Sequence, residues 1–143
     1  MADSSDIDNA IVLKLASDAT LTALLQSGAA VFVDEAKSGS TKFVIVSLVS
    51  EVDVPQFGGR SFEDALYLVE VRMLATPSTA VGNIKAAAAR VDALLDGGTL
   101  TVAGYTLMVM RREERFRTLE RDEADESITW HRRGGHYRIV MST

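Results

Sequence analysis

The sequence predicts an α+β fold, with helices packed on one face of a mostly antiparallel β-sheet that carries a long protruding hairpin. Two segments, near the N-terminus and around residues 79–96, place apolar residues at helical spacing. The remaining Val- and Ile-rich segments are bounded by turn-forming residues, which is typical of strands. The 143 residues, without cysteine, fit one domain over residues 1–143 that needs no metal or disulfide to hold its core.

The N-terminal segment predicts two short helices, or one kinked helix, after a flexible stretch over residues 1–6. Ser17 or Asp18 is placed to cap the second helix, and Gly28 marks its end. The apolar residues that define the first helix at its expected spacing are Ile7, Ala10, Ile11 and Leu15.

A hairpin with a protruding loop follows a short strand at residues 30–33. Its strands are expected at residues 42–54 and 62–75, and the glycine-containing loop between them spans residues 55–61. Alternation in the second strand predicts that one of its faces is buried. The residues expected on that face are Tyr67, Val69, Val71 and Met73.

A second helical segment is expected at residues 79–96, capped by Thr76 or Ser78 with Pro77 in the first turn. Gly97 and Gly98 are expected to end it. Its predicted apolar stripe consists of Val81, Ile84, Ala88, Val91, Leu94 and Leu95.

The C-terminal third predicts short strands around a charged loop, with the glycine pair at 134–135 as a turn between the last two. The strands are expected at residues 100–102, 105–115, 127–132 and 136–141, and the charged loop at 119–126.

Charge and hydropathy exclude several classes of function. A net charge of −5 disfavours a protein that wraps nucleic acid by neutralising phosphates, although DNA can slide past an acidic wall. The polar N-terminus does not resemble a secretory signal, and no apolar run reaches the length of about 18 residues that a membrane span requires.

The two histidines, His131 and His136, are the strongest candidates for catalytic chemistry. Across a turn they would meet, and with Glu126 they would form a conceivable metal site. Their spacing matches no known ligand motif, so we interpret them as exposed residues beside a glycine turn. We therefore predict no catalytic residue, no metal and no cofactor, and a non-enzymatic protein.

Two groups of residues are candidates for an interface between subunits or with a partner. One is a mixed-charge strand, on which alternation would put Arg111, Glu113, Arg115 and Arg117 on a shared face. Such a strand is most often a solvated surface, and the alternative is an interface in which charge pairs fix the register of a contact. The other is the hairpin tip, which presents Val54, Pro55, Phe57 and Arg60.

Residues 7–117 resemble the tail-terminator (tail-to-head joining, or tail-completion) proteins of long-tailed bacteriophages. The resemblance lies in the run from Ser17 to Leu25, in Lys42–Val46, in Tyr67–Ala75 with the helix after it, and in Leu100–Tyr105. These motifs are diffuse hydrophobic patterns. Lys42 departs from the family's usual proline, and residues 117–135 do not align with the family.

The resemblance implies a virion protein that forms a homo-oligomeric ring, commonly a hexamer, at the head-proximal end of the tail. Its partners would be the tail tube protein and the head–tail connector, with viral DNA passing through the ring without sequence-specific binding. The alternatives are another neck protein, an assembly chaperone that leaves the virion, or a small metal-dependent hydrolase that uses the two histidines.

Phe57→Asp is expected to weaken assembly without unfolding the subunit, because it places a charge in a loop tip and leaves the core intact. Tail length and infectivity measure assembly, and circular dichroism checks the fold. Unchanged tails and infectivity would contradict a role for this loop.

Overall fold

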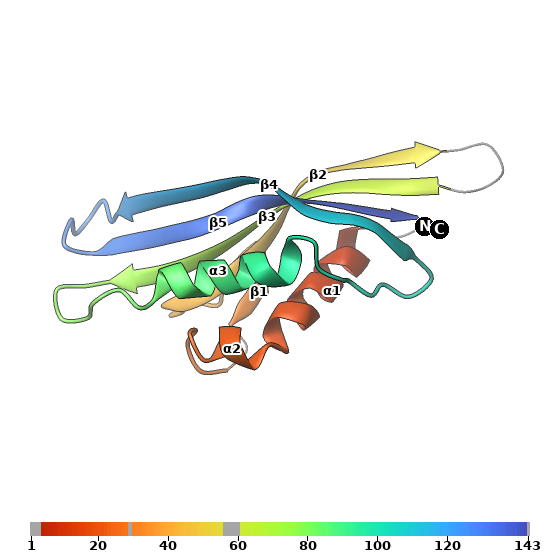
Figure 1. The fold of residues 1–143 in the computed structure, drawn as a ribbon. Helices are drawn as coiled ribbons and strands as arrows, with labels where there is room; N and C mark the ends of the chain where they lie inside the picture. Colours follow the sequence, from red (N-terminus) through yellow and green to blue (C-terminus); the bar gives the residue numbers. More distant parts are fainter. Residues whose placement is uncertain (1–3, 29, 56–60, 143) are drawn as a thin grey trace.

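A computed structural model describes residues 4–28, 30–55 and 61–142, and it confirms the predicted α+β class (Figure 1). The helices lie on one face of a twisted five-stranded sheet. In chain order the elements are α1 (Ser4–Ala16), α2 (Ala19–Thr22), β1 (Val31–Val33), β2 (Lys42–Pro55), β3 (Ser61–Ala75), α3 (Ile84–Leu95), β4 (Thr106–Arg121) and β5 (Thr129–Ser142).

The sheet has the strand order β1-β2-β3-β5-β4, with β1 parallel to β2 and every other pair antiparallel. The long β2–β3 hairpin was predicted correctly, and it extends beyond the helical layer (Figure 1). Phe57 and Arg60 of its tip lie outside the described residues.

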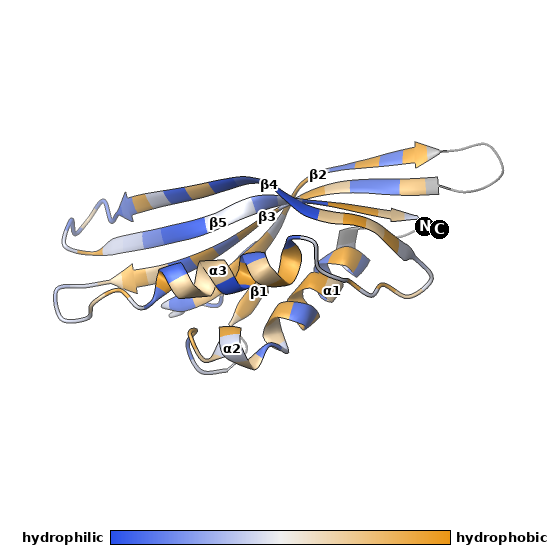
Figure 2. Cartoon of the chain, viewed as in Figure 1, coloured by the Kyte–Doolittle hydropathy of each residue, from blue (hydrophilic) through white to orange (hydrophobic). Residues whose placement is uncertain are grey.

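The core lies between the helices and one face of the sheet. Tyr67, Val69, Val71 and Met73 are fully buried, as the alternation predicted. Figure 2 shows hydrophobic residues recurring along both α1 and α3. The fully buried helix residues opposite this face include Ile7, Ile11, Leu15, Ala87 and Leu95. At the edge of this layer the Tyr67 hydroxyl donates a hydrogen bond to Asp8 Oδ1 at 2.5 Å, which fixes α1 on the sheet.

Both helical segments differ in their bounds from the sequence prediction. Helix α1 begins at Ser4, so residues 4–6 are helical although the sequence assigned them to a flexible terminus. Helix α3 begins at Ile84 because Asn83 is its N-cap: its side chain accepts a hydrogen bond from the Ala86 amide at 3.1 Å. The Thr76–Thr79 segment closes its own turn by backbone hydrogen bonds and so cannot cap the helix.

The C-terminal strands were predicted too short. Strand β5 runs without interruption through Gly134 and Gly135, and β4 continues to Arg121, into the predicted charged loop. A Cβ atom at Gly134 would lie 2.2 Å from the Val69 carbonyl oxygen, so this glycine permits a close approach of β3 and β5. Gly134 and Gly135 therefore lie inside a strand, whereas the sequence predicted a turn at these two residues. Residues 100–102 form no strand.

Among the described residues, no helix is long and apolar enough to cross a membrane.

Leu95→Ala is expected to lower the free energy of unfolding by about 2–5 kcal/mol, because Leu95 is fully buried and truncation leaves a cavity. Leu94→Ala is the matched control, since Leu94 is only partly buried at the edge of the core. Urea unfolding measures both variants, and an equal loss in the two would contradict this packing.

Helix α2 is tied to α3 by a charged contact. Asp18 caps α2 by accepting from the Leu21 amide at 2.9 Å, and Arg90 of α3 donates to both Asp18 oxygens at 2.8 and 2.7 Å. The hydrogen bonds from Arg90 are the largest cause that lowers the pKa of Asp18, from 3.8 to about 2. Since the folded-state pKa is the lower one, this contact stabilises the fold above about pH 4, and the contribution is lost as the pH falls toward 2.

Asp18→Asn should reduce the acid sensitivity of the fold, since asparagine also caps helices but carries no charge. The free energy of unfolding is measured by urea titration at about pH 5 and about pH 2.5. The free energy of unfolding should fall more between these two pH values in the wild type than in the variant. Equal losses would show that the ion pair makes no pH-dependent contribution.

Candidate interaction surfaces

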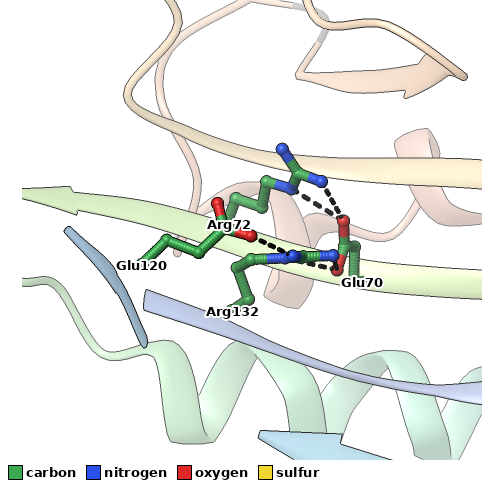
Figure 3. Close-up of polar contacts among 4 residues, drawn as sticks. All are labelled: Glu70, Arg72, Glu120 and Arg132. Carbon is green, nitrogen blue, oxygen red and sulfur yellow. Dashed lines mark hydrogen bonds and ion pairs between the residues drawn. The ribbon is translucent and has the colours of Figure 1, made fainter. Parts of the chain in front are cut away.

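The sheet face opposite the helices carries a charged network at its centre (Figure 3). Glu70 of β3 accepts hydrogen bonds from Arg72 Nε at 2.7 Å and from Arg132 Nε and Nη2 at 3.0 and 2.8 Å. Arg132 of β5 also pairs through Nη1 with Glu120 of β4. The network therefore connects the three strands β3, β5 and β4 on a face that no described helix covers.

Glu70 is only 1% exposed, so its charge depends on these arginines. A buried carboxylate is costly unless it is both paired and hydrogen-bonded, and Glu70 is both. Gly134 aligns with Glu70, and its Cβ would lie 2.6 Å from the Glu70 Cα atom. Because Gly134 has no side chain, the backbones of β5 and β3 can approach closely at Glu70.

The sequence predicted that Arg111, Glu113, Arg115 and Arg117 share one face of the mixed-charge strand β4. The structure contradicts this prediction. A β-bulge between Arg112 and Glu114 reverses the alternation. Glu113 accordingly pairs with Arg138 on the open face, and Arg111 lies at the ion-pair limit of 3.9 Å from Glu113.

Beyond the bulge, β4 turns its arginines toward α3. Arg115 and Arg117 line a cleft of about 520 Å³ between α3, β4 and β5, together with Lys85 and Arg133. One carboxylate, Asp92, lies among these four cations. Within the described part of the chain, Lys85, Arg117 and Arg133 have no carboxylate at ion-pair distance. The cleft is therefore strongly cationic although the chain is acidic overall.

Asp92 anchors α3 to the two strands that form the cleft floor. It accepts a hydrogen bond from the Tyr137 hydroxyl at 2.9 Å and pairs with Arg112 at 2.5 Å and Arg115 at 3.5 Å. Burial, followed by the bond to Asp92, raises the pKa of Tyr137, so the phenol stays protonated as a donor. The cleft walls are thus held in place by charge and by packing.

The turn between β4 and β5 is acidic and well formed. Asp122 Oδ1 accepts from the Ala124 amide at 2.8 Å, and Asp125 Oδ1 accepts from the Ser127 amide and hydroxyl at 3.0 and 2.5 Å. The hydroxyl bond from Ser127 is the main cause that lowers the pKa of Asp125. Residues 122–126 therefore present four carboxylates, those of Asp122, Glu123, Asp125 and Glu126. We call them the acidic turn.

The histidines do not form a metal site together. His131 lines a second hollow beside Ile84 of α3, on the helical face. His136 packs against Phe116, on the open face, with ring centroids 6.3 Å apart. The interpretation of both as exposed residues beside a glycine turn is wrong, because both are partly buried and β5 runs through Gly134 and Gly135 without a turn.

The hairpin stem exposes apolar side chains before its tip. Val52 and Val54 of β2 are 57% and 39% exposed, which places Val54 on an accessible surface. The side chain of Pro55 lies outside the described residues, as do Phe57 and Arg60.

Sequence reasoning missed Glu70, the cationic cleft and a cluster of three carboxylates in the hairpin stem. Glu70 breaks an apolar alternation, and a buried carboxylate of this kind signals a paired arginine. Lys85 and Arg133 are far apart in sequence, and no local pattern joins them. The carboxylate cluster follows from the hairpin register alone.

No family model and no curated protein matches this chain. Its fold is similar to that of a chain in a solved structure described as "Virion of native gene transfer agent (GTA) particle", with a TM-score of 0.68. The two chains are 24% identical, and the match covers 99% of this chain and 98% of the other.

Glu70→Ala is expected to lower the free energy of unfolding by about 3–5 kcal/mol, because it leaves Arg132 and Arg72 beside a cavity without their partner. Glu120→Ala removes the outer acid, which is about half exposed at 52%, and should cost about 1 kcal/mol or less. Chemical denaturation compares the two variants. A loss for Glu70→Ala no larger than that for Glu120→Ala would contradict the central role of Glu70.

Proposed function

We propose that this chain is a structural protein of a phage-like virion that acts by self-assembly and not by catalysis. The observation that carries the proposal is the end-to-end similarity of its fold to a chain of a virion particle. A likeness over both full lengths means that the two chains share the whole fold and not only a part of it. The tail-terminator resemblance over residues 7–117 points in the same direction.

Within that class, the proposed role is a tail terminator. A homo-oligomeric ring, taken as a hexamer, would cap the head-proximal end of the tail tube, stop its growth and join it to the head connector. Viral DNA would pass through the ring without sequence-specific contacts. An acidic chain suits such a lumen, because a negative wall does not hold DNA back.

Opposite charges on one subunit supply a mechanism for joining copies. The cationic cleft carries Lys85, Arg115, Arg117 and Arg133, and the acidic turn carries four carboxylates. When a turn of one copy enters the cleft of the next, the contact is heterologous, and repetition closes a ring if the rotation is suitable. Complementary charge then sets the register and speeds the encounter.

The remaining candidate surfaces suit contacts with partners. The hairpin tip, with Val54, Pro55, Phe57 and Arg60, is proposed to dock on the tail tube or on a neighbouring subunit. Of the β4 residues, Arg115 and Arg117 are assigned to the cleft. Arg111 and Glu113 lie on the open face, where they are available to a second partner.

Imaging of purified particles tests the assigned position. A tagged copy of the chain should appear at the junction of head and tail, and deletion should give tails of uncontrolled length that fail to join heads. A chain found in particles at another place in the neck would favour a different connector role. Absence from particles, with assembly still dependent on the chain, would favour an assembly chaperone.

Reversal of charge on one side of the proposed contact should dissociate the assembly. Arg117→Glu with Arg133→Glu places like charges opposite the acidic turn, which should raise the dissociation constant by more than about tenfold. Light scattering after size-exclusion chromatography measures the mass.

The matched control reverses both sides. Glu123→Lys with Glu126→Lys should also dissociate the assembly, and the chain with all four changes should regain it, because the charges are again complementary. Lys37→Glu, at an exposed position outside both surfaces, should have a smaller effect. If either pair alone assembles normally, or if the four-fold variant stays dissociated, the cleft and turn do not form the contact.

A further inference from the structure

Three carboxylates meet on the helix-side face of the hairpin stem. Glu51 and Asp53 are two residues apart on β2, and Asp53 lies directly opposite Glu63 of β3. One oxygen from each of the three lies within 4.8 Å of the others. Like charges placed opposite each other across a strand pair destabilise it, so this grouping needs a compensating interaction.

Burial makes the cluster more than a group of surface acids. Glu63 is only 3% exposed, and its Oε2 atom is buried with no hydrogen-bond partner in the part of the chain that the structure describes. Asp53, in contrast, is exposed, so the cluster opens to solvent on one side. A buried, unsatisfied carboxylate oxygen costs free energy unless a cation or a donor reaches it.

Glu70 is a second buried carboxylate of the same sheet, and it differs from Glu63 in having partners within the protein. Its oxygens accept from two arginines, and its charge is balanced within the protein. No described side chain does this for Glu63 Oε2. The difference indicates that the partner of Glu63 comes from outside the described residues.

We propose that Glu51, Asp53 and Glu63 bind a hard divalent cation, Ca²⁺ or Mg²⁺. Both ions prefer carboxylate oxygens, and both complete their coordination with water, which the open side of the cluster admits. With neither histidine nor cysteine in the cluster, the ligand set does not suit a borderline-soft ion such as Zn²⁺. The bound ion would join β2 to β3 near the base of the protruding tip and stiffen the hairpin.

Calorimetric titration of the full chain with CaCl₂, and separately with MgCl₂, tests the site. We expect saturable binding and a rise in melting temperature with either salt, because a ligand that binds the folded state stabilises it. NaCl at matched ionic strength is the control for screening.

Asp53→Asn removes one exposed ligand, and Glu63→Gln removes the buried one. Each should weaken binding by at least about tenfold, because loss of even an outer-shell group costs that much. Glu123→Gln, in the acidic turn, should bind as the wild type does. Asp53→Asn keeps the test valid if Glu63→Gln does not fold, since Asp53 lies at the surface.

Three outcomes would overturn the proposal: no heat and no melting shift beyond the NaCl control, unchanged affinity in Asp53→Asn, or equal weakening in Glu123→Gln. A melting temperature that rises with acid and ignores both cations would also overturn it, because protonation would then relieve the repulsion. None of these outcomes bears on assembly, so the proposed virion role is tested separately.

Discussion

Burial of one face of the sheet under α1 and α3 is the constraint on which the rest of the structure depends. Every second residue of β3 from Ala65 to Met73 is fully buried on that side. Because side chains alternate along a strand, the same register puts Leu66, Leu68 and Glu70 on the other face. The helices thus decide which residues remain for contacts with other molecules.

The open face is organised by charge where the covered face is organised by apolar packing. Glu70 and Arg132 bridge the central strands, and Arg138 of β5 pairs with Asp64 and Glu113 farther along. These bonds pin neighbouring strands without a second helical layer. A sheet face held by such ion pairs can present a rigid, polar surface to a partner, which suits a subunit of a larger assembly.

The sequence predicted the parts of the fold that local pattern controls. The β2–β3 hairpin and the buried face of β3 follow from period-two alternation, and Asp18 was recognised as a cap. The C-terminal half was harder because its signals are ambiguous at short range. Gly134 reads as a turn in sequence, but its role depends on the Val69 carbonyl of another strand.

The candidate sites, like the C-terminal strands, depend on contacts between segments that are far apart in the sequence. A one-residue bulge after Arg112 separates Arg111 from Arg115, and no propensity marks where the bulge falls. The cationic cleft joins Lys85 of α3 to Arg133 of β5, which only the packed structure brings together. The hairpin-stem carboxylates were within reach of sequence reasoning, because the register around the loop pairs Asp53 with Glu63.

The proposed role requires surfaces that recognise copies of this chain and neighbouring virion parts. Native mass spectrometry of the purified chain over a range of concentrations tests that claim most directly. The account predicts one dominant oligomer of fixed copy number, as a closed ring requires, which dissociates as added salt screens the charges. A monomer at every concentration, at low salt and with divalent cations present, would contradict it.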